Sequence, residues 1–380
     1  MVEQIDPNNQ RLQQINIDVL TPLVQKALDR SATVTSWNYQ PLTGGFGGGM
    51  GGTFLYRFSG TAEDQGQPLE WSMILKIIAQ RPDEDPADPK YWKREYEFYR
   101  SGIFDHLPGR MQVVRCYGTL EFEGESCWLW LEELHDDFGG RWPVEHYEIV
   151  GRHAGHFNGA FLGKSFDADW LSTQWLHKTI ESVTPHFPNI LDSLEHPLLK
   201  PVLAADARVQ YERLLVDYER FLTALDRLPQ TIAHLDYFQR NAFAQRTAEG
   251  SYKTIAVDWA FAGQAAIGAD AAMPVLLGLF MANIDPNHTA ENEKRVFDGY
   301  IAGLRETGWN GSEREVRLGY AATTALRYIE LSSTHPLLVN PEIQPFIEAD
   351  IGCPISQYIH HTAAMNQLAY RMADEARTLL

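Results

Sequence analysis

The sequence predicts an α+β protein with two lobes: a smaller lobe with a five-stranded antiparallel sheet and one helix, and a larger, mainly helical lobe. Before Leu134, segments rich in β-branched and aromatic residues alternate with turn residues, and one helical pattern interrupts them. From His135 onward helical patterns dominate, apart from one hairpin. We therefore expect the lobes to cover residues 1–134 and 135–380.

Composition and charge narrow the class of protein. The 380 residues are 44% hydrophobic and carry a net charge of −18, which supports packed cores and argues against a nucleic-acid-binding surface. The three cysteines form no C-x-x-C pair and suggest neither a disulfide framework nor a zinc site. No apolar run reaches membrane-spanning length. We expect a cytoplasmic protein with no membrane partner, and the sequence leaves monomer or homodimer open.

The first lobe contains a glycine-rich hairpin. An amphipathic helix over residues 17–28 precedes a strand over 32–42, and a second strand covers 53–58. Between these strands, Gly44 to Gly52 reads GGFGGGMGG, with seven glycines in nine residues. Such a loop approaches a ligand without Cβ clashes, and its N–H groups bind phosphate oxygens. The candidate phosphate-binding residues are Gly45, Phe46, Gly47, Gly48 and Gly49. The alternative is a flexible loop without a ligand.

A lysine and a glutamate on neighbouring elements each lie on an apolar face, where each charge needs an opposite charge as its partner. The third strand, residues 71–78, alternates so that Lys76 shares a face with Ile74 and Ile78. A buried ammonium group needs a partner, because leaving it unpaired costs on the order of several kcal/mol. The next helix runs from an N-cap at Asp88 to Gly102, and its apolar face carries Glu95. We expect these two side chains to pair rather than to be independent surface charges.

Two further strands, over residues 112–122 and 126–134, complete the expected sheet, with a Glu-Gly-Glu turn between them.

The hairpin in the second lobe gathers oxygen-bearing side chains. Two short strands over residues 241–245 and 254–257 are joined by a polar turn, and His-Leu-Asp precedes the first. The pairing would bring Asp236, Asn241 and Asp258 to one edge. Two carboxylates and an amide suit Mg²⁺, which binds phosphate oxygens. The pattern H-x-D-x-x-x-x-N followed by a strand ending in Asp is typical of kinase-type phosphoryl transfer. Ordinary turn formation is the alternative.

With the glycine-rich hairpin, Lys76, Glu95, HLDYFQRN and VDW in this order, the chain resembles the aminoglycoside phosphotransferase and choline-kinase-like superfamily, small-molecule kinases with a protein-kinase-like fold. Three positions depart from or only loosely match the family pattern. Leu235 stands where the family commonly has Gly, and Asn158 where it usually has His. Asp270 matches the family's G-x-x-x-x-D-L-A loosely, and is otherwise the N-cap of a helix over 271–281.

The resemblance implies an ATP- and Mg²⁺-dependent transfer of the γ-phosphoryl group to a hydroxyl of a small molecule. In that mechanism Asp236 orients the acceptor hydroxyl and takes its proton, while Asn241 and Asp258 hold the metal. Lys76, oriented by Glu95, contacts the α- and β-phosphates. The resemblance also implies that backbone groups near Glu133 and Leu134 contact adenine, and that ATP binds between the lobes. We expect His234 to brace the catalytic loop rather than to act as the base.

The acceptor stays open at the level of sequence. An acidic and aromatic lining would suit a cationic amino sugar or an amino alcohol, while a neutral sugar, a nucleoside and a macrolide are alternatives. A catalytically inactive, kinase-like nucleotide-binding module is a rival. A protein kinase is disfavoured, because the segment between Trp259 and Asp270 leaves little room for an activation loop.

Overall fold

A computed structural model of the protein describes residues 9–42, 53–82, 85–102, 107–166 and 168–380. The chain forms two compact units. Unit 1 comprises residues 1–84, 92–105 and 113–135, and unit 2 comprises residues 85–91, 106–112 and 136–380. In the part of the chain that the structure describes, no helix is both long and apolar enough to cross a lipid bilayer.

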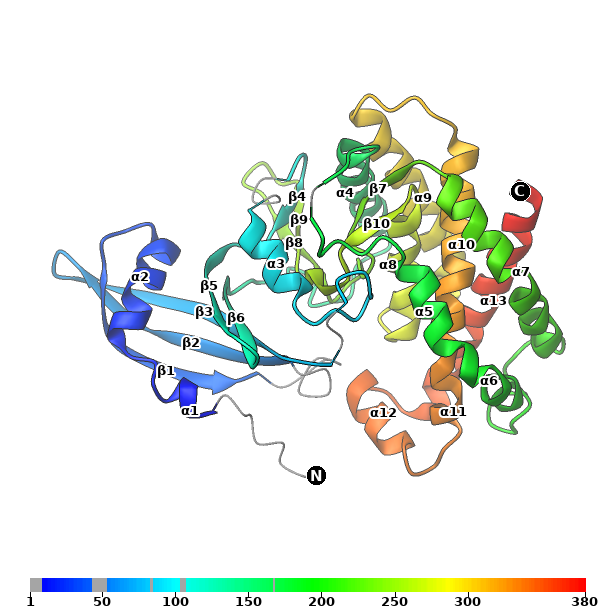
Figure 1. The fold of residues 1–380 in the computed structure, drawn as a ribbon, viewed down its shortest axis with the longest axis horizontal. Helices are drawn as coiled ribbons and strands as arrows, with labels where there is room; N and C mark the ends of the chain where they lie inside the picture. Colours follow the sequence, from blue (N-terminus) through cyan, green and yellow to red (C-terminus); the bar gives the residue numbers. More distant parts are fainter. Residues whose placement is uncertain (1–8, 43–52, 83–84, 103–106, 167) are drawn as a thin grey trace. The chain divides into compact units, whose positions relative to one another are not determined.

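Unit 1 is built on a five-stranded antiparallel sheet with the strand order β1-β2-β3-β6-β5 (Figure 1). Its strands are β1 (Thr33–Pro41), β2 (Thr53–Asp64), β3 (Gln67–Ala79), β5 (Cys116–Phe122) and β6 (Ser126–Glu132). Its helices are α1 (Asn9–Leu12), α2 (Ile17–Leu28) and α3 (Arg94–Ser101). Together with the mainly helical unit 2, this sheet confirms the predicted α+β fold class.

Helix α2 covers one face of this sheet. Asn16 caps the helix by accepting from the backbone N–H groups of Asp18 and Val19. Its apolar side packs Leu20 and Val24 into a core with aromatic and aliphatic residues of the strands. Burying a side chain of this size contributes about 1.5–3 kcal/mol, so this helix anchors the sheet.

Strand β3 alternates as predicted. The side chains that face α2 are fully buried or nearly so: Trp71, Met73, Leu75 and Ile77. The opposite face carries Lys76.

Two predicted element boundaries are wrong. Helix α3 begins at Arg94 and not at Asp88, because the Asp88 carboxylate accepts the Lys90 N–H at 2.8 Å and closes a turn. The predicted strand over 112–122 is two strands. Its first part, β4 (Met111–Val113), joins a different sheet beside β9.

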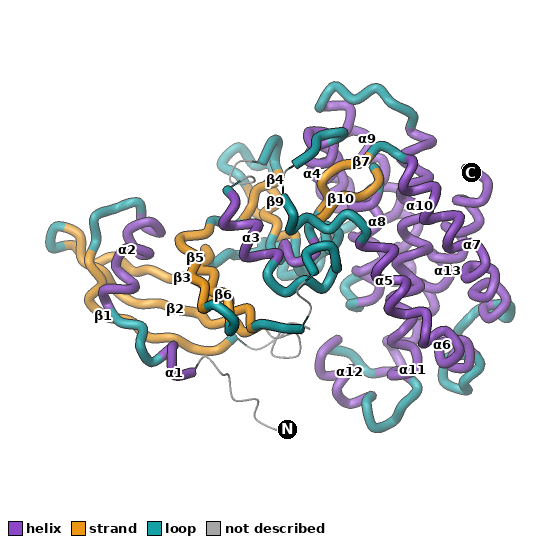
Figure 2. The backbone as a smooth tube through the Cα atoms, viewed as in Figure 1, coloured by secondary structure: helices purple, strands orange, loops and turns teal. Residues whose placement is uncertain are grey.

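Unit 2 is mainly helical (Figure 2). Its longer helices are α4 (His146–Phe161), α5 (Trp175–Val183), α7 (Ala207–Arg227), α8 (Ala269–Phe280), α9 (Thr289–Glu306), α10 (Glu313–Leu331) and α13 (Ile355–Leu379). Shorter helices are α6 (Phe187–Leu194), α11 (His335–Leu338) and α12 (Gln344–Ile351). Its strand pairs are β7 (Gln230–Ala233) with β10 (Gly263–Ala266), and β8 (Ala242–Arg246) with β9 (Tyr252–Ala256).

Helices α4 and α9 approach each other through glycines. A Cβ added at Gly155 would lie 2.0 Å from the backbone oxygen of Tyr300, and one at Gly303 would lie 2.0 Å from that of Arg152. Such contacts require the absence of a side chain. The two helices therefore form a close-packed frame behind the strands of unit 2.

Candidate active site

The hairpin of β8 and β9 brings two predicted site residues to one end. Ala242 pairs with Ala256, and the Val257 N–H donates to the Asn241 carbonyl at 2.9 Å. Asn241 thus directly precedes β8, and Asp258 directly follows the end of the paired strands. The predicted convergence of the two side-chain positions is present within unit 2.

Asp236 is tied to Asn241. The Asn241 Nδ2 donates to the Asp236 carboxylate at 2.7 Å and to its carbonyl at 3.0 Å. Both partners are acceptors, so the amide nitrogen must be the atom that faces them. The amide oxygen of Asn241 consequently points away from Asp236, the orientation in which it is available to a cation.

The Asp236 carboxyl group lies in a low-dielectric environment. The residue keeps some accessible surface, yet burial of the carboxyl raises its pKa to about 7. Arg327 and the Asn241 hydrogen bond act to lower this pKa, while the carboxylates of Asp258 and Glu330 raise it further. A carboxyl group whose pKa lies near neutrality is suited to accept a proton from a hydroxyl.

The loop between β7 and Asn241 contains a strained residue. Leu235, where the family pattern commonly has glycine, has a φ of 63° and is fully buried. The left-handed conformation costs about 1–2 kcal/mol in a residue with a Cβ. The Leu235 N–H donates to Asp270 at 2.8 Å, and burial of the side chain offsets the strain. Asp258 also lies in the left-handed region, with a φ of 61°.

Asp270 holds this loop in place. Its carboxylate accepts the N–H groups of His234 and Leu235 and the side-chain amide of Asn158. It is not a helix N-cap: Gly268 occupies that position of α8. Asn158 in turn accepts from the Tyr300 hydroxyl at 2.7 Å. The asparagine that departs from the family pattern therefore belongs to a buried network that positions the catalytic loop.

His234 bonds within the loop, in agreement with its predicted bracing role. Its Nε2 lies 2.9 Å from the Val257 carbonyl, and its Nδ1 accepts the Asp236 N–H at 3.3 Å. Burial lowers the pKa of His234, which keeps the ring neutral. The neutral ring with a proton on Nε2 satisfies both contacts at once.

The predicted pair in unit 1 is present. Lys76 Nζ lies 2.5 Å from a carboxylate oxygen of Glu95, and the side chains are only 9% and 2% exposed. Glu95 reaches it from the first turn of α3, on the buried side of that helix. The two opposite charges compensate each other, as a buried pair requires.

The structure describes the residues predicted to contact the adenine base, but not the glycine-rich residues predicted to contact the phosphates. Glu133 lies beyond the end of β6, where its carboxylate binds Arg57 Nε at 2.7 Å, and Leu134 follows it. The ion pair and a hydrogen bond from Ser72 lower the pKa of Glu133 against the effect of burial. Gly45, Phe46, Gly47, Gly48 and Gly49 lie outside the described residues.

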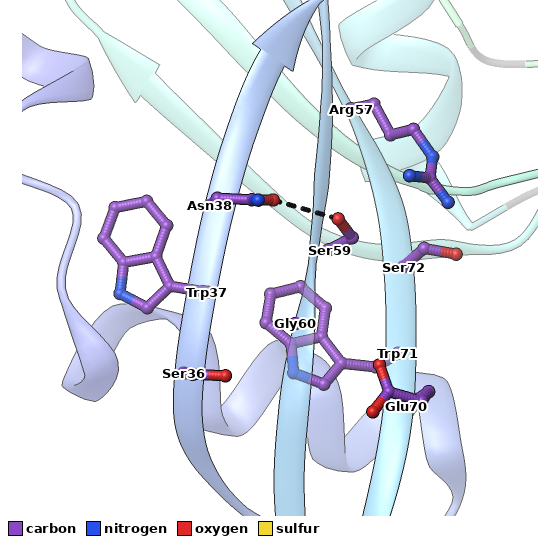
Figure 3. Close-up of a pocket in the computed structure, with 9 residues that line it drawn as sticks. All are labelled: Ser36, Trp37, Asn38, Arg57, Ser59, Gly60, Glu70, Trp71 and Ser72. Atoms are coloured by element: carbon purple, nitrogen blue, oxygen red, sulfur yellow. Dashed lines mark hydrogen bonds between the residues drawn. The ribbon is translucent and has the colours of Figure 1, made fainter.

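Arg57 and Ser72 also line a hollow over β1, β2 and β3, of about 620 Å³ (Figure 3). Figure 3 shows the hydroxyl of Ser59 bonded to Asn38 across this face. Among the residues that the structure describes, none of the predicted site residues lines this hollow. It is connected to Glu133 through the Arg57 ion pair and the Ser72 hydrogen bond.

One residue that acts electrostatically on Asp236, Arg327, was missed by the sequence prediction. Arg327 on α10 is almost fully buried, forms an ion pair with Glu330, and places its guanidinium 5.6 Å from the rings of Trp175 and Phe261. Phe261 follows Asp258 by three positions. A helical pattern alone gives no signal that an arginine of a distant helix acts electrostatically on Asp236.

The donor set fits a hard divalent cation. Within the described residues, no group of three His, Cys, Asp or Glu side chains could hold a metal by itself. The carboxylate of Asp258 and the outward amide oxygen of Asn241 are two oxygen atoms of the type that would coordinate such a cation. Mg²⁺ commonly takes one or two protein ligands and completes its shell with water and substrate phosphates.

Comparisons with known proteins give structural matches alone. No protein-family model and no curated protein sequence matches the chain. Spectinomycin phosphotransferase, solved with ADP and spectinomycin, is 12% identical with a TM-score of 0.47, over 94% of this chain and 99% of the other. An amicoumacin kinase with AMP-PNP and Ca²⁺ is 12% identical with a TM-score of 0.48, over 94% and 97%. An aminoglycoside-3'-phosphotransferase is 16% identical with a TM-score of 0.41, over 78% and 93%.

These solved structures are small-molecule phosphotransferases, the superfamily that the sequence motifs resemble. All three TM-scores lie below 0.5, so these matches carry no argument about the function of this chain.

Proposed function

We propose that this protein is a small-molecule kinase that transfers the γ-phosphoryl group of ATP to a hydroxyl group. The observation that carries the proposal is the Asn241–Asp236 hydrogen bond at the end of the hairpin that also presents Asp258. This arrangement combines a proton acceptor with two metal-binding oxygens. Phosphoryl transfer needs this combination and little covalent chemistry from the protein.

Each proposed site residue of unit 2 has a role that follows from its contacts. Asp236 accepts a hydrogen bond from the acceptor hydroxyl and removes its proton as the oxygen attacks phosphorus. Asn241 fixes the rotation of the Asp236 carboxylate through its amide nitrogen. His234 and Asp270 fix the backbone of the same loop. Asn241 and Asp258 would hold Mg²⁺, which when bound neutralises charge on the phosphate oxygens.

In unit 1, we assign Lys76 to the α- and β-phosphates. Glu95 fixes its ammonium group at 2.5 Å, so the lysine has a defined position before any nucleotide arrives. A fixed positive charge costs no reorganisation when negative charge develops. Backbone groups at Glu133 and Leu134 are assigned to the adenine base, and the Gly45 to Gly49 segment to the phosphates.

Substitution of the two aspartates tests the proposal. The protein is incubated with Mg²⁺ and ATP labelled on the γ-phosphate, together with a panel of hydroxyl-bearing molecules. We expect Asp236→Asn to lower kcat by several orders of magnitude, roughly, with the affinity for ATP nearly unchanged. Asp258→Ala should abolish productive Mg-ATP binding. Arg208→Gln, an exposed arginine of α7, is the control.

Full turnover by Asp258→Ala would contradict the assignment. Binding of Mg-ATP with no transfer to any acceptor would instead favour the rival, an inactive nucleotide-binding module. A thermal shift on addition of Mg-ATP separates binding from turnover.

We extend the proposal to acceptors with and without an amine. Glu330 is partly exposed and lies within electrostatic reach of Asp236, which favours a cationic amino sugar or amino alcohol. Its partner Arg327 balances that charge. The panel therefore includes neutral sugars, nucleosides and macrolides beside the amines. The ratio of kcat/KM for amine acceptors to kcat/KM for neutral acceptors shows which class the enzyme prefers.

A further inference from the structure

A cavity of about 850 Å³ lies entirely within unit 2, at the turn of the catalytic hairpin. Its lining comes from α4, from the turn that joins β8 to β9, from Gly109 and Arg110, and from Glu306 of α9. Its size falls in the range of about 300–1,000 Å³ that is usual for small-molecule sites. The five residues of β9, at about 3.3 Å each, place it roughly 17 Å from Asp258. It is thus separate from the proposed active site.

Two arginines line this cavity. Arg110 donates to the Ser251 hydroxyl at 2.6 Å, and Arg152 pairs with Glu306. Each guanidinium has five N–H donors, so both retain donors beyond these contacts. The side chain of Arg152 is 58% exposed and can therefore reach a ligand. In a chain with a net charge of −18, the lining holds two arginines and one glutamate.

Two histidines of α4 add polar atoms to the same lining. His153 bonds Thr254 through Nδ1 at 2.8 Å, and burial lowers its pKa to about 3, so its ring stays neutral. His156 Nδ1 is buried and forms no hydrogen bond with any residue that the structure describes. A buried polar atom without a partner is costly, by about 1–3 kcal/mol. This atom packs against Gly109, where an added Cβ would lie 2.5 Å from it.

Tyr252 lines another part of the cavity. The ring of Tyr252 lies with its centroid 5.2 Å from those of His146 and Phe138, and Arg246 covers it at 5.4 Å. These contacts hold the tyrosine in one orientation. A ligand with a carbon skeleton would therefore find an apolar surface next to the two guanidinium groups.

We propose that this cavity is a second ligand site, which binds a small organic anion carrying phosphate or carboxylate groups. Arg110 and Arg152, which both line the cavity, bind the anionic groups. Planar guanidinium groups recognise both kinds of anion through paired hydrogen bonds. Glu306 opposes binding, because it occupies Arg152 and repels negative charge. The proposal does not depend on the kinase activity proposed above.

Titration calorimetry on the full chain, with EDTA present, tests this site. Citrate is the carboxylate probe and inorganic pyrophosphate the phosphate probe. We expect saturable binding of at least one probe, with Arg110→Gln and Arg152→Gln each weakening it about tenfold or more. Glu306→Gln should strengthen it, a gain that loss of structure cannot produce. Arg208→Gln removes one exposed charge elsewhere and should leave the affinity unchanged.

Other results would overturn the proposal. Equal affinities in the wild type and both arginine variants would place the bound anion elsewhere. Absence of saturable binding by either probe would remove the site. Binding of a hexaglutamate peptide with neither small anion bound would assign the cavity to an acidic polypeptide. The two probes also distinguish the ligand's chemistry, since the probe that binds more tightly identifies the favoured anionic group.

Discussion

His335 is a buried titratable residue without a hydrogen-bond partner. It is fully buried at the start of α11, with its ring 6.0 Å from that of Tyr328. Neither ring nitrogen bonds any residue that the structure describes. Burial lowers the pKa of His335 to about 4, against an ordinary value near 6.5. The unfolded chain therefore binds a proton in this interval that the folded chain does not.

This difference predicts an acid-sensitive stability. Because the unfolded state takes up the proton first, the free energy of unfolding falls as the pH drops from about 6.5 to about 4. The interval of roughly 2.5 pH units corresponds to about 3 kcal/mol for this residue. We expect His335→Leu to remove this part of the pH dependence, as measured by urea unfolding at pH 7 and pH 5.

The control for this measurement is His288→Gln, since His288 is exposed. It should leave the pH dependence as in the wild type. At pH 7, His335→Leu should also raise stability slightly, because it removes two buried nitrogens without partners. A variant with the same acid slope as the wild type would show that other groups, such as His146, account for it.

At the same scale, the sequence allowed the candidate catalytic residues to be named but not their surroundings. Asp236, Asn241 and Asp258 lie close together in the sequence, so the predicted hairpin already placed them at one end of two paired strands. The roles of Asp270 and Arg327 depend on segments far from that stretch. Local pattern gave Asp270 only a helix cap as an alternative, and gave no indication for Arg327.

At the scale of elements, hydrogen bonds connect the α4–α9 interface to the catalytic loop. Asn158 of α4 and Tyr300 of α9 form the buried network with Asp270. The same two helices touch through Gly155, whose added Cβ would lie 2.0 Å from the Tyr300 carbonyl oxygen. A backbone atom cannot rotate away, so a side chain here must push the helices apart.

We therefore predict that Gly155→Ala lowers both stability and activity. Overpacking costs about 1–3 kcal/mol in the free energy of unfolding, and displacement of Tyr300 loosens the Asp270 network. Urea unfolding and kcat measure the two effects. Gly118→Ala is the matched control, because its Cβ would meet only the flexible Leu23 side chain at 2.7 Å. Similar losses in both variants would count against a special role of this interface.

The element boundaries show where sequence patterns fail. The third strand and the buried face of α3 could be predicted, because alternation and helical spacing are set by burial. The start of α3 could not, since Asp88 is as good a turn residue as a helix cap. The break between β4 and β5 at Val114 and Arg115 could not be predicted either, because β4 pairs with β9, a strand that lies far along the chain.

For the whole molecule, stability and function make opposite demands on the Lys76–Glu95 pair. The pair is buried, with 9% and 2% of the side chains exposed. Desolvation of two charges cancels much of their attraction, so such a pair contributes little net stability. Its persistence in the core of unit 1 is then explained by a ligand that needs the lysine, which the proposed function supplies.

A cycle of three variants separates the two demands. Lys76→Met and Glu95→Leu each remove one partner of this buried ion pair, and each should lower the free energy of unfolding by about 3–5 kcal/mol. The double variant should recover most of that stability, since apolar side chains of similar size replace both charges. Phosphotransfer should stay lost in the double variant, because no ammonium remains for the phosphates. Recovery of kcat/KM together with stability would show that Lys76 is structural, and a double variant as unstable as the single ones would show that the pair itself stabilises the sheet.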